Sequence, residues 1–320
     1  MDWDIQPYAA GSDAADAYAL WQSALGQTWP IDANRFFQVL AGPQPQHFVV
    51  RDEQRVVGLA VTFQTRQGNN LMGHLAAIVV MPSYQHRGIG SALHDMALEY
   101  LRTAHVGFVQ LGAFSPRFWC GMPTNLPDAM RFFARHGWEY AAESVYDMTR
   151  DLSDYETPAK ITQRMAQERI TIEPAHQRDI TQVLTFEQQH FPNWLIHFEQ
   201  YADMGDFQDL LVARDDVGNI VGTLVMSSPQ SHPQRPDVIW QSLLGQDAGS
   251  LGSVGVAESE RGRGIGIALV ARASEILKSR SVRNCYIDWL VLIDFYGKLG
   301  YSVWREYRGS WRSFPTTSER

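Results

Sequence analysis

The sequence predicts a mixed α/β fold that is built twice, in two tandem domains of the same topology. The chain has 320 residues, of which 45% are hydrophobic and 19% charged. This composition is ordinary for a globular protein, and the length suits two domains of about 150 residues each. A glycine-rich hexapeptide occurs twice, at residues 85–90 and 261–266, each time between a β-rich run and an amphipathic helical pattern. This repeated order of strand, turn and helix predicts two copies of one α/β unit.

Further matches accompany the hexapeptides in the same order along the chain. The matching pairs are Ile5-Gln6-Pro7 with Ile172-Glu173-Pro174, Val57-Gly58 with Val221-Gly222, and residues 132–138 with residues 295–301. We therefore expect a first domain at residues 1–152, a linker at 153–168 and a second domain at 169–320. Pro158 would stand in the first turn of a linker helix.

Each copy is expected to begin with a strand and a helix, followed by a hairpin. In the first copy the hairpin strands are predicted at residues 47–50 and 55–61, and a further strand at 77–80 leads into the hexapeptide. A helix follows, and a last strand, helix and strand complete a sheet of about seven strands. Apolar residues recur at helical spacing after each hexapeptide: Leu93, Met96, Ala97, Tyr100 and Leu101 in the first copy, and Leu269, Val270, Ala273, Ile276 and Leu277 in the second.

Two insertions distinguish the copies. The first copy is longer than the second between the hexapeptide and the last helix, and its extra residues lie around 114–121. The second copy is longer between the glycine of the hairpin and the hexapeptide, and its extra residues lie near 227–233. Each insertion could be a surface loop or a wall of a pocket.

The net charge and the cysteines exclude several classes of protein. The charge of −8 argues against a broad nucleic-acid surface and mildly favours a neutral or cationic small substrate. Cys120 and Cys285 lie in different halves, so neither a zinc site nor a disulfide framework is indicated. No basic and apolar leader begins the chain, and no uninterrupted apolar stretch is long enough to span a bilayer. We expect a cytoplasmic protein without a metal.

The hexapeptides have the chemistry of a phosphate-binding loop. A glycine-rich turn that enters a helix directs unpaired N–H groups at an anion, at the positive end of the helix dipole. Glycine lets the backbone approach a diphosphate closely, and neighbouring arginines add positive charge. A Walker loop would require Gly-Lys-Ser/Thr, and a dinucleotide fingerprint would require glycine where Ile267 stands. Neither motif is present.

Residues 80–90 and 256–266 resemble the acyl-CoA signature of the GNAT N-acetyltransferases, and residues 295–301 resemble a later helix motif of that family. The resemblance covers nearly the whole chain as two GNAT domains. It implies acetyl-CoA as the co-substrate, an amine acceptor and direct transfer of the acetyl group. It also implies a sheet that is splayed between strands at residues 251–256 and 284–289, where the pantetheine arm would bind. The implied cofactor-binding residues are Val254, Val256, Arg261, Gly262, Arg263, Gly264, Ile265 and Gly266, and in the first copy Ile78, Val80, Gln85, His86, Arg87, Gly88, Ile89 and Gly90.

The resemblance also indicates which copy performs the chemistry. A tyrosine on the last helix protonates the departing thiolate in the family, and Tyr296 matches its position, whereas the first copy has Phe133. The second copy is therefore the expected catalytic domain. Many relatives carry a glutamate on the fourth strand, but neither matching stretch contains a carboxylate. Asp288 and, less favourably, Glu258 are candidates for relaying a proton through water.

Several functions stay open at the level of the sequence. The main expectation is acetyl transfer to the amine of a small molecule or peptide. A CoA-sensing or scaffolding protein without turnover is one alternative, and acetylation of protein N-termini or lysines is another. The first copy could bind acyl-CoA weakly, bind it structurally or serve as a scaffold.

Overall fold

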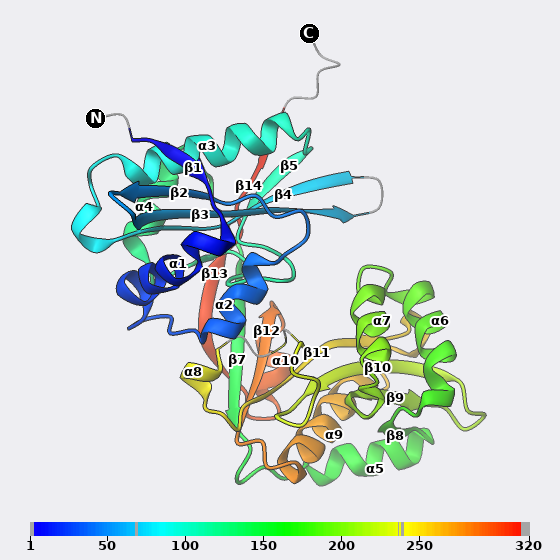
Figure 1. The fold of residues 1–320 in the computed structure, drawn as a ribbon. Coiled ribbons are helices and arrows are strands. Elements are labelled where there is room, and N and C mark those ends of the chain that lie inside the picture. The colour runs from blue at the N-terminus through cyan, green and yellow to red at the C-terminus, as the bar shows by residue number, and fades with distance from the viewer. Residues whose placement is uncertain (1–2, 68–69, 236, 238–239, 315–320) are drawn as a thin grey trace. The chain divides into compact units, whose positions relative to one another are not determined.

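The polypeptide forms two mixed α/β units that exchange segments near their ends. The computed structural model describes residues 3–67, 70–235, 237 and 240–314 (Figure 1). Unit 1 comprises Met1–Val145 and Arg305–Arg320, and unit 2 comprises Tyr146–Trp304. None of the described helices is long and apolar enough to cross a membrane.

Unit 1 contains a mixed sheet in the order β1-β2-β3-β4-β5-β14. Its strands are β1 (Ile5–Pro7), β2 (Phe48–Asp52), β3 (Arg55–Gln67), β4 (Asn70–Val80), β5 (Phe108–Leu111) and β14 (Trp311–Ser313). Its other elements are α1 (Ala10–Leu25), α2 (Ala33–Leu40), η1 (Pro82–Tyr84), α3 (Ile89–Thr103), β6 (Met122–Pro123) and α4 (Pro127–Arg135). The strand before the hexapeptide is longer than predicted, because β4 begins at Asn70 rather than at residue 77.

The strands of unit 2 belong to a second sheet of the described residues, with the order β6-β13-β7-β12-β11-β10-β9-β8. The strands are β7 (Ser144–Asp151), β8 (Thr171–Pro174), β9 (Leu210–Arg214), β10 (Ile220–Ser227), β11 (Gly249–Val256) and β12 (Asn284–Leu290). The helices are α5 (Ala159–Glu168), α6 (Ile180–His190), α7 (Leu195–Asp203), α8 (Gln241–Leu244), α9 (Ile265–Ser279) and α10 (Ile293–Gly297), with short turns η2 (Gln177–Asp179), η3 (Phe207–Asp209) and η4 (Glu258–Glu260). β13 (Ser302–Arg308) begins in unit 2 and ends in unit 1.

The repeat in the sequence and the units in space are divided differently. β7 belongs to the first domain expected from the sequence, residues 1–152, yet it pairs with β12 of unit 2, from Asn284↔Asp151 to Leu290↔Tyr146. In the opposite direction, β14 from the end of the chain pairs with β5 of unit 1, from Trp311↔Gln110 to Ser313↔Phe108. Each unit therefore includes a strand that comes from the far side of the repeat boundary. β14 lies at the edge of its sheet, whereas β7 lies between β12 and β13.

The fourth and fifth strands separate in both units. β4 and β5 pair in parallel only from Met72↔Phe108 to Leu75↔Leu111, while β4 continues to Val80. β11 and β12 pair only at Gly249↔Cys285 and Ser250↔Tyr286, while both strands continue for several residues. The parallel ladder thus ends where the strand that leads into the hexapeptide still runs on.

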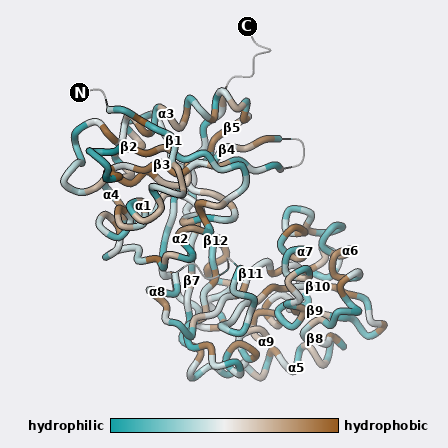
Figure 2. The backbone as a smooth tube through the Cα atoms, viewed as in Figure 1, coloured by the Kyte–Doolittle hydropathy of each residue, from teal (hydrophilic) through white to brown (hydrophobic). Residues whose placement is uncertain are grey.

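The sheet of unit 2 has one core on each face. Leu251, Cys285 and Ile287 pack with α9 on one face, whereas Val212 and Val225 pack with α6 and α7 on the other. Figure 1 shows the helices on these opposite faces, and hydrophobic residues are visible along α6, α9 and the strands in Figure 2. Because side chains alternate along a strand, Tyr286 and Asp288 lie on the face opposite α9.

Candidate functional site

The two hexapeptides fold into the same backbone structure. Gly88 has φ 87° and Gly264 has φ 85°, and each is the N-cap of a helix of 15 residues. Two residues earlier, His86 and Gly262 also have positive φ, at 60° and 83°. A short 3₁₀ turn, η1 or η4, precedes each loop. The repetition seen in the sequence is therefore also a repetition of backbone conformation.

Equivalent hydrogen bonds hold both loops to their sheets. The N–H of Met81 donates to the Val57 carbonyl at 2.9 Å, and that of Ala257 donates to the Val221 carbonyl at 3.0 Å. The side chain of Gln85 donates to the Val80 carbonyl at 3.1 Å. Arg261 donates to the Val256 carbonyl at 3.4 Å. The side chains of Gln85 and Arg261 thus bind the ends of β4 and β11, the strands that precede their loops.

Both loops present backbone donors that could hold an anion. Within the described residues, the N–H groups of 86–90 and 262–266 donate to no partner in the protein. An added Cβ at Gly88 or Gly262 would meet nothing within 4 Å, so the space above each turn is open. Unpaired N–H groups at a helix N-terminus with open space above them fit a diphosphate.

The charged residues around the loops differ between the units. In unit 2, Arg263 forms ion pairs with Glu168 at 2.8 Å and with Glu260, and these hydrogen bonds raise its pKa. Arg164 of α5 donates to the Gly262 carbonyl at 2.6 Å. Its guanidinium also lies 3.3 Å from the place of a Cβ on Gly264. The helix between the two domains therefore adds a cation beside the second loop, which the sequence analysis did not foresee.

The last helix of each repeat is placed in the same way. Gly137 and Gly300, which follow these helices, have φ 79° and 80°. Phe132 lies 3.3 Å from a Cβ built on Gly90, and Phe295 lies 3.5 Å from one built on Gly266. The next residues are Phe133 in unit 1 and Tyr296 in unit 2.

Tyr296 is a buried phenol. Only 9% of its surface is exposed, and burial raises the pKa of its hydroxyl to about 12. The hydroxyl therefore keeps its proton at neutral pH. Phe133 is equally buried but has no proton to donate.

Carboxyl groups gather on the face of the unit 2 sheet opposite α9. Asp288 is half-buried on β12, next to a bulge between Ile287 and Leu290. Asp147 of β7 is 2% exposed and accepts hydrogen bonds from the Tyr286 hydroxyl and the Trp289 N–H. Glu258 lies elsewhere, exposed on η4 in front of the loop.

Glu187 is a further carboxyl on this face that the sequence analysis missed. It is fully buried on α6, where Oε1 accepts a hydrogen bond from the Thr223 hydroxyl at 2.5 Å and Oε2 has no partner among the described residues. Burial raises the pKa of its carboxyl to about 7. Thr223 stands opposite Gly255 of β11. A glutamate in an amphipathic helix ordinarily indicates the solvent side, so no pattern distinguished this one.

Glu187 should make stability depend on pH. Its pKa of about 7 in the folded protein lies above the ordinary value of 4.5, so the folded state binds more protons between these pH values and loses stability as pH rises through them. Relative to wild type, Glu187→Gln should therefore gain up to about 3 kcal/mol in free energy of unfolding from pH 4.5 to pH 8. Urea unfolding at both pH values measures this. The exposed Glu199→Gln is the control, and a difference that stays constant with pH would count against the prediction.

The insertion at residues 114–121 in unit 1 is a buried part of the core rather than a surface loop. Phe118 is 1% exposed and Trp119 is 7% exposed. Their rings lie 4.4 Å and 5.4 Å from the ring of Trp21 on α1, measured between centroids. Phe118 also contacts Phe36 of α2. Aromatic side chains thus fill the space beside α1 and α2, the helices that correspond in chain order to α6 and α7 of unit 2.

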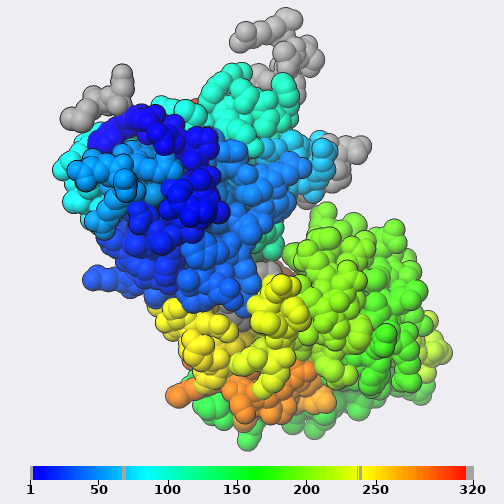
Figure 3. Space-filling model, in the orientation of Figure 1, coloured from blue at the N-terminus to red at the C-terminus, as the bar shows by residue number. Residues whose placement is uncertain are grey.

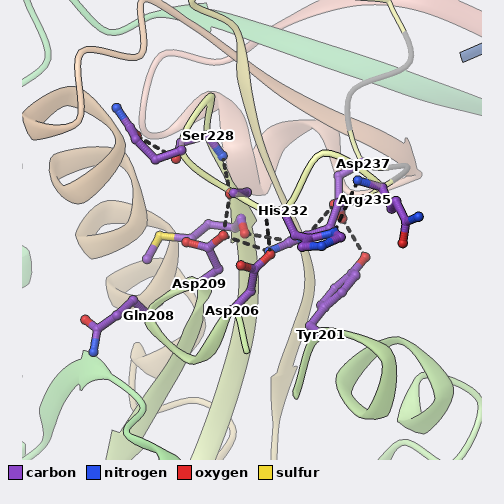
Figure 4. A network of polar contacts seen from close by, with 12 residues as sticks. Tyr201, Asp206, Gln208, Asp209, Ser228, His232, Arg235 and Asp237 are labelled. Carbon is purple, nitrogen blue, oxygen red and sulfur yellow. Dashed lines mark hydrogen bonds and ion pairs between the residues drawn. The ribbon is translucent and has the colours of Figure 1, made fainter. Parts of the chain in front are cut away.

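The insertion after β10 in unit 2 is held by a buried arginine. Arg235 is 1% exposed and donates to Asp209 at 2.7 Å, to Asp237 at 2.8 Å and to the Met226 carbonyl at 2.7 Å. Its guanidinium lies 3.9 Å from the centroid of the Tyr201 ring on α7 (Figure 4). Figure 3 shows the yellow atoms of this segment beside the green atoms of α7. The network fixes the insertion against α7.

Two comparisons match the chain with known proteins. Residues 14–138 and 174–301 each match the family model described as "Acetyltransferase (GNAT) family". A GCN5-related glucosamine N-acetyltransferase region of a fungal multi-domain GH3 β-N-acetylglucosaminidase has a solved structure that is 36% identical, with a TM-score of 0.93. The match covers 97% of this chain and 38% of that one, so this chain spans well under half of that protein.

Two more distant structures share the fold. The GCN5-related N-acetyltransferase from Sphaerobacter thermophilus is 19% identical, with a TM-score of 0.69 and coverage of 97% of this chain and 95% of that one. A tandem GNAT protein from the clavulanic acid biosynthesis pathway is 16% identical, with a TM-score of 0.69 and coverage of 98% and 100%. A search of curated proteins gave no match.

Proposed function

This chain belongs to the GNAT acetyltransferase family, and from this premise we propose that it is an acetyl-CoA-dependent N-acetyltransferase for an amino sugar such as glucosamine. The observation that carries the choice of acceptor is the 36% identity, over 97% of this chain, to a region named as a glucosamine N-acetyltransferase. The mixed sheets, the splayed strands and the paired loops are consistent with this family.

Unit 2 is the proposed catalytic unit. Its loop, with Arg261, Gly262, Arg263, Gly264, Ile265 and Gly266, would hold the diphosphate of CoA through the unpaired N–H groups. The backbone of Val254 and Val256 would bind the pantetheine arm where β11 has no partner strand. When bound, acetyl-CoA supplies the activated acetyl thioester. Tyr296 keeps its proton at neutral pH and would donate it to the leaving sulfur.

The acidic face of unit 2 supports a cationic amine as the acceptor. Asp147, Asp288 and Glu187 lie on the side of the sheet opposite α9, and a Cβ on Gly252 would meet nothing within 4 Å there. Carboxylates favour the approach of an ammonium group and can accept the proton that it must lose before attack. We assign the proton relay to Asp288, with Glu187 adding a carboxyl that is partly ionised at neutral pH.

Unit 1 is proposed to bind acyl-CoA without turnover. Its loop, with Gln85, His86, Arg87, Gly88, Ile89 and Gly90, has the same conformation as the second, and Ile78 and Val80 lie on the strand that leads into it. Phe133 cannot supply a proton, and Phe118 and Trp119 fill the space beside α1 and α2. This unit thus keeps the means to hold a diphosphate but lacks the acid.

A panel of acceptors tests the proposed function. Release of the CoA thiol from acetyl-CoA is measured with glucosamine, galactosamine, a lysine peptide and N-acetylglucosamine, which has no free amine. We expect saturable release with glucosamine, with N-acetylglucosamine as the product by mass spectrometry, and none with N-acetylglucosamine as the acceptor. Faster release with the peptide would favour a protein acetyltransferase. Binding of acetyl-CoA without release with any amine would favour a sensor.

A further inference from the structure

β7 pairs irregularly with β12 beside the unit 2 site. It lies between the two family matches along the sequence, after residue 138 and before residue 174, yet in space it pairs with β12. The register runs from Ile287↔Met148 directly to Leu290↔Tyr146. Asp288 and Trp289 therefore stand opposite the single residue Asp147. Trp289 has φ 49°, which only a few non-glycine residues adopt. This arrangement is a β-bulge, and bulges commonly redirect a side chain next to an active site.

The side chain of Asp147 accepts two hydrogen bonds from residues at the bulge. Its Oδ1 accepts the backbone N–H of Trp289 at 3.0 Å, and its Oδ2 accepts the Tyr286 hydroxyl at 2.9 Å. Asp147 and Tyr286 are 2% and 3% exposed, so water does not compete freely for these bonds. A carboxylate offers two acceptor oxygens, whereas an asparagine offers only one. Asparagine could still accept the Trp289 N–H on its oxygen and donate from its amide nitrogen to the Tyr286 hydroxyl oxygen, so alanine is the substitution that removes both bonds.

We propose that Asp147 is a positioning residue of the catalytic unit, and that it holds the 288–289 bulge so that Asp288 faces the acceptor amine. This inference rests on the proposed function of unit 2. Asp147 bonds both to the residue after Asp288 and to the side chain two residues before it. It thereby holds the backbone after Asp288 and the side chain two residues before it. The catalytic face of unit 2 thus depends on a strand that lies outside the second family match.

β14, the strand that unit 1 receives from the end of the chain, can be compared with β7. β14 pairs with β5 of unit 1 through Trp311↔Gln110, Arg312↔Val109 and Ser313↔Phe108, without a shift of register. The described residues of that pair therefore hold no bulge of this kind. Among the described residues, the bulge thus occurs at the exchanged strand of the unit that has Tyr296, and not at the exchanged strand of the unit that has Phe133.

The test compares Asp147→Ala with Asp151→Ala, which removes an exposed carboxylate from the same strand. We expect Asp147→Ala to lower kcat roughly tenfold, less than the roughly 100-fold that a misplacement of 1 Å can cause. The dissociation constant for CoA should stay within about twofold, because the loop is untouched. In hydrogen exchange followed by NMR, the Trp289 amide should be protected in wild type and exposed in Asp147→Ala. Asp151→Ala should match wild type in each measurement.

A double-variant cycle separates positioning from a general loss of stability. If Asp147 acts through Asp288, Asp147→Ala should have little further effect on kcat when Asp288 is already asparagine. Multiplicative effects in the double variant would overturn the inference. The inference would also be overturned if the Trp289 amide of the wild-type protein exchanged as fast as exposed amides do. This measurement does not depend on the folding of any variant. The amide exchange does not require turnover, so failure of every amine in the acceptor panel would count against the proposed function alone.

Discussion

Replacing Tyr296 with phenylalanine should lower kcat for acetyl transfer by about 100- to 10,000-fold, the usual contribution of a positioned general acid. The hydroxyl is the only group removed, and its pKa of about 12 means that it is protonated throughout the neutral pH range. Without it, the thiolate leaves as a poorly stabilised anion. Because the phenyl ring still packs against Phe295, folding and the affinity for CoA should change little. Stopped-flow measurement of thiol release gives kcat, and calorimetry gives the affinity.

Two further variants make the result specific. Tyr84→Phe removes an exposed hydroxyl from the turn before the first loop and should leave kcat unchanged. Phe133→Tyr places a phenol at the matching position of unit 1, and it should not restore the activity of Tyr296→Phe, because aromatic side chains fill the space beside α1 and α2. Full turnover by Tyr296→Phe would show that another group protonates the thiolate.

The parts of the fold that could be predicted depend on local chemistry. A turn with positive φ at Gly88 and Gly264 demands glycine. The hairpin glycines Gly58 and Gly222 are required because a Cβ there would lie 2.7 Å and 3.2 Å from side chains of the following helices. Such constraints act within a few residues or between adjacent elements, and they occur twice, so the sequence showed both the turns and the repeat. The match of Tyr296 with Phe133 followed from the same spacing.

The parts that could not be predicted depend on distant pairing. Nothing in residues 144–151 states whether this strand completes its own repeat or the other one, because either sheet would accept the same alternation of side chains. The roles of Asp147 and Glu187 follow from that pairing and from burial, which the helical or strand pattern does not show.

The insertions illustrate the same limit. From the sequence, residues 114–121 were equally consistent with a surface loop and with a wall of a pocket. In the structure Phe118 and Trp119 are core residues of unit 1. The extra residues after β10 gave no sign that Arg235 would be buried against Asp206 and Asp209, which lie before β9 in the chain. A buried ion pair needs partners that only the folded chain brings together.

Gly88 and Gly264 allow the division of labour between the units to be tested with matched variants. Their φ values are nearly equal, at 87° and 85°, and both residues are helix N-caps. A side chain in this left-handed region is strained, and aspartate and asparagine tolerate it better than most residues. Gly→Asp adds a negative charge to the anion site, and Gly→Asn at the same position carries the same strain without the charge. At Gly264 the new carboxylate would also face the guanidinium of Arg164, since an added Cβ lies 3.3 Å from its Cζ atom.

The expected effect follows from the repulsion of like charges. At a separation of about 5 Å and an effective dielectric constant of about 20, two unit charges repel by roughly 3 kcal/mol, which corresponds to more than 100-fold in affinity. Gly264→Asp should therefore lower kcat/KM for acetyl-CoA by about 100-fold or more. The neutral isostere Gly264→Asn should lose far less, and added salt should reduce the difference between the two.

The most direct measurement is the glucosamine-dependent rate of thiol release from acetyl-CoA in Gly264→Asp and Gly88→Asp, side by side at a limiting acetyl-CoA concentration. If unit 2 alone transfers the acetyl group, Gly264→Asp loses about 100-fold while Gly88→Asp stays within about twofold of wild type. An equal loss in both variants, or a loss confined to Gly88→Asp, would contradict catalysis by the second unit.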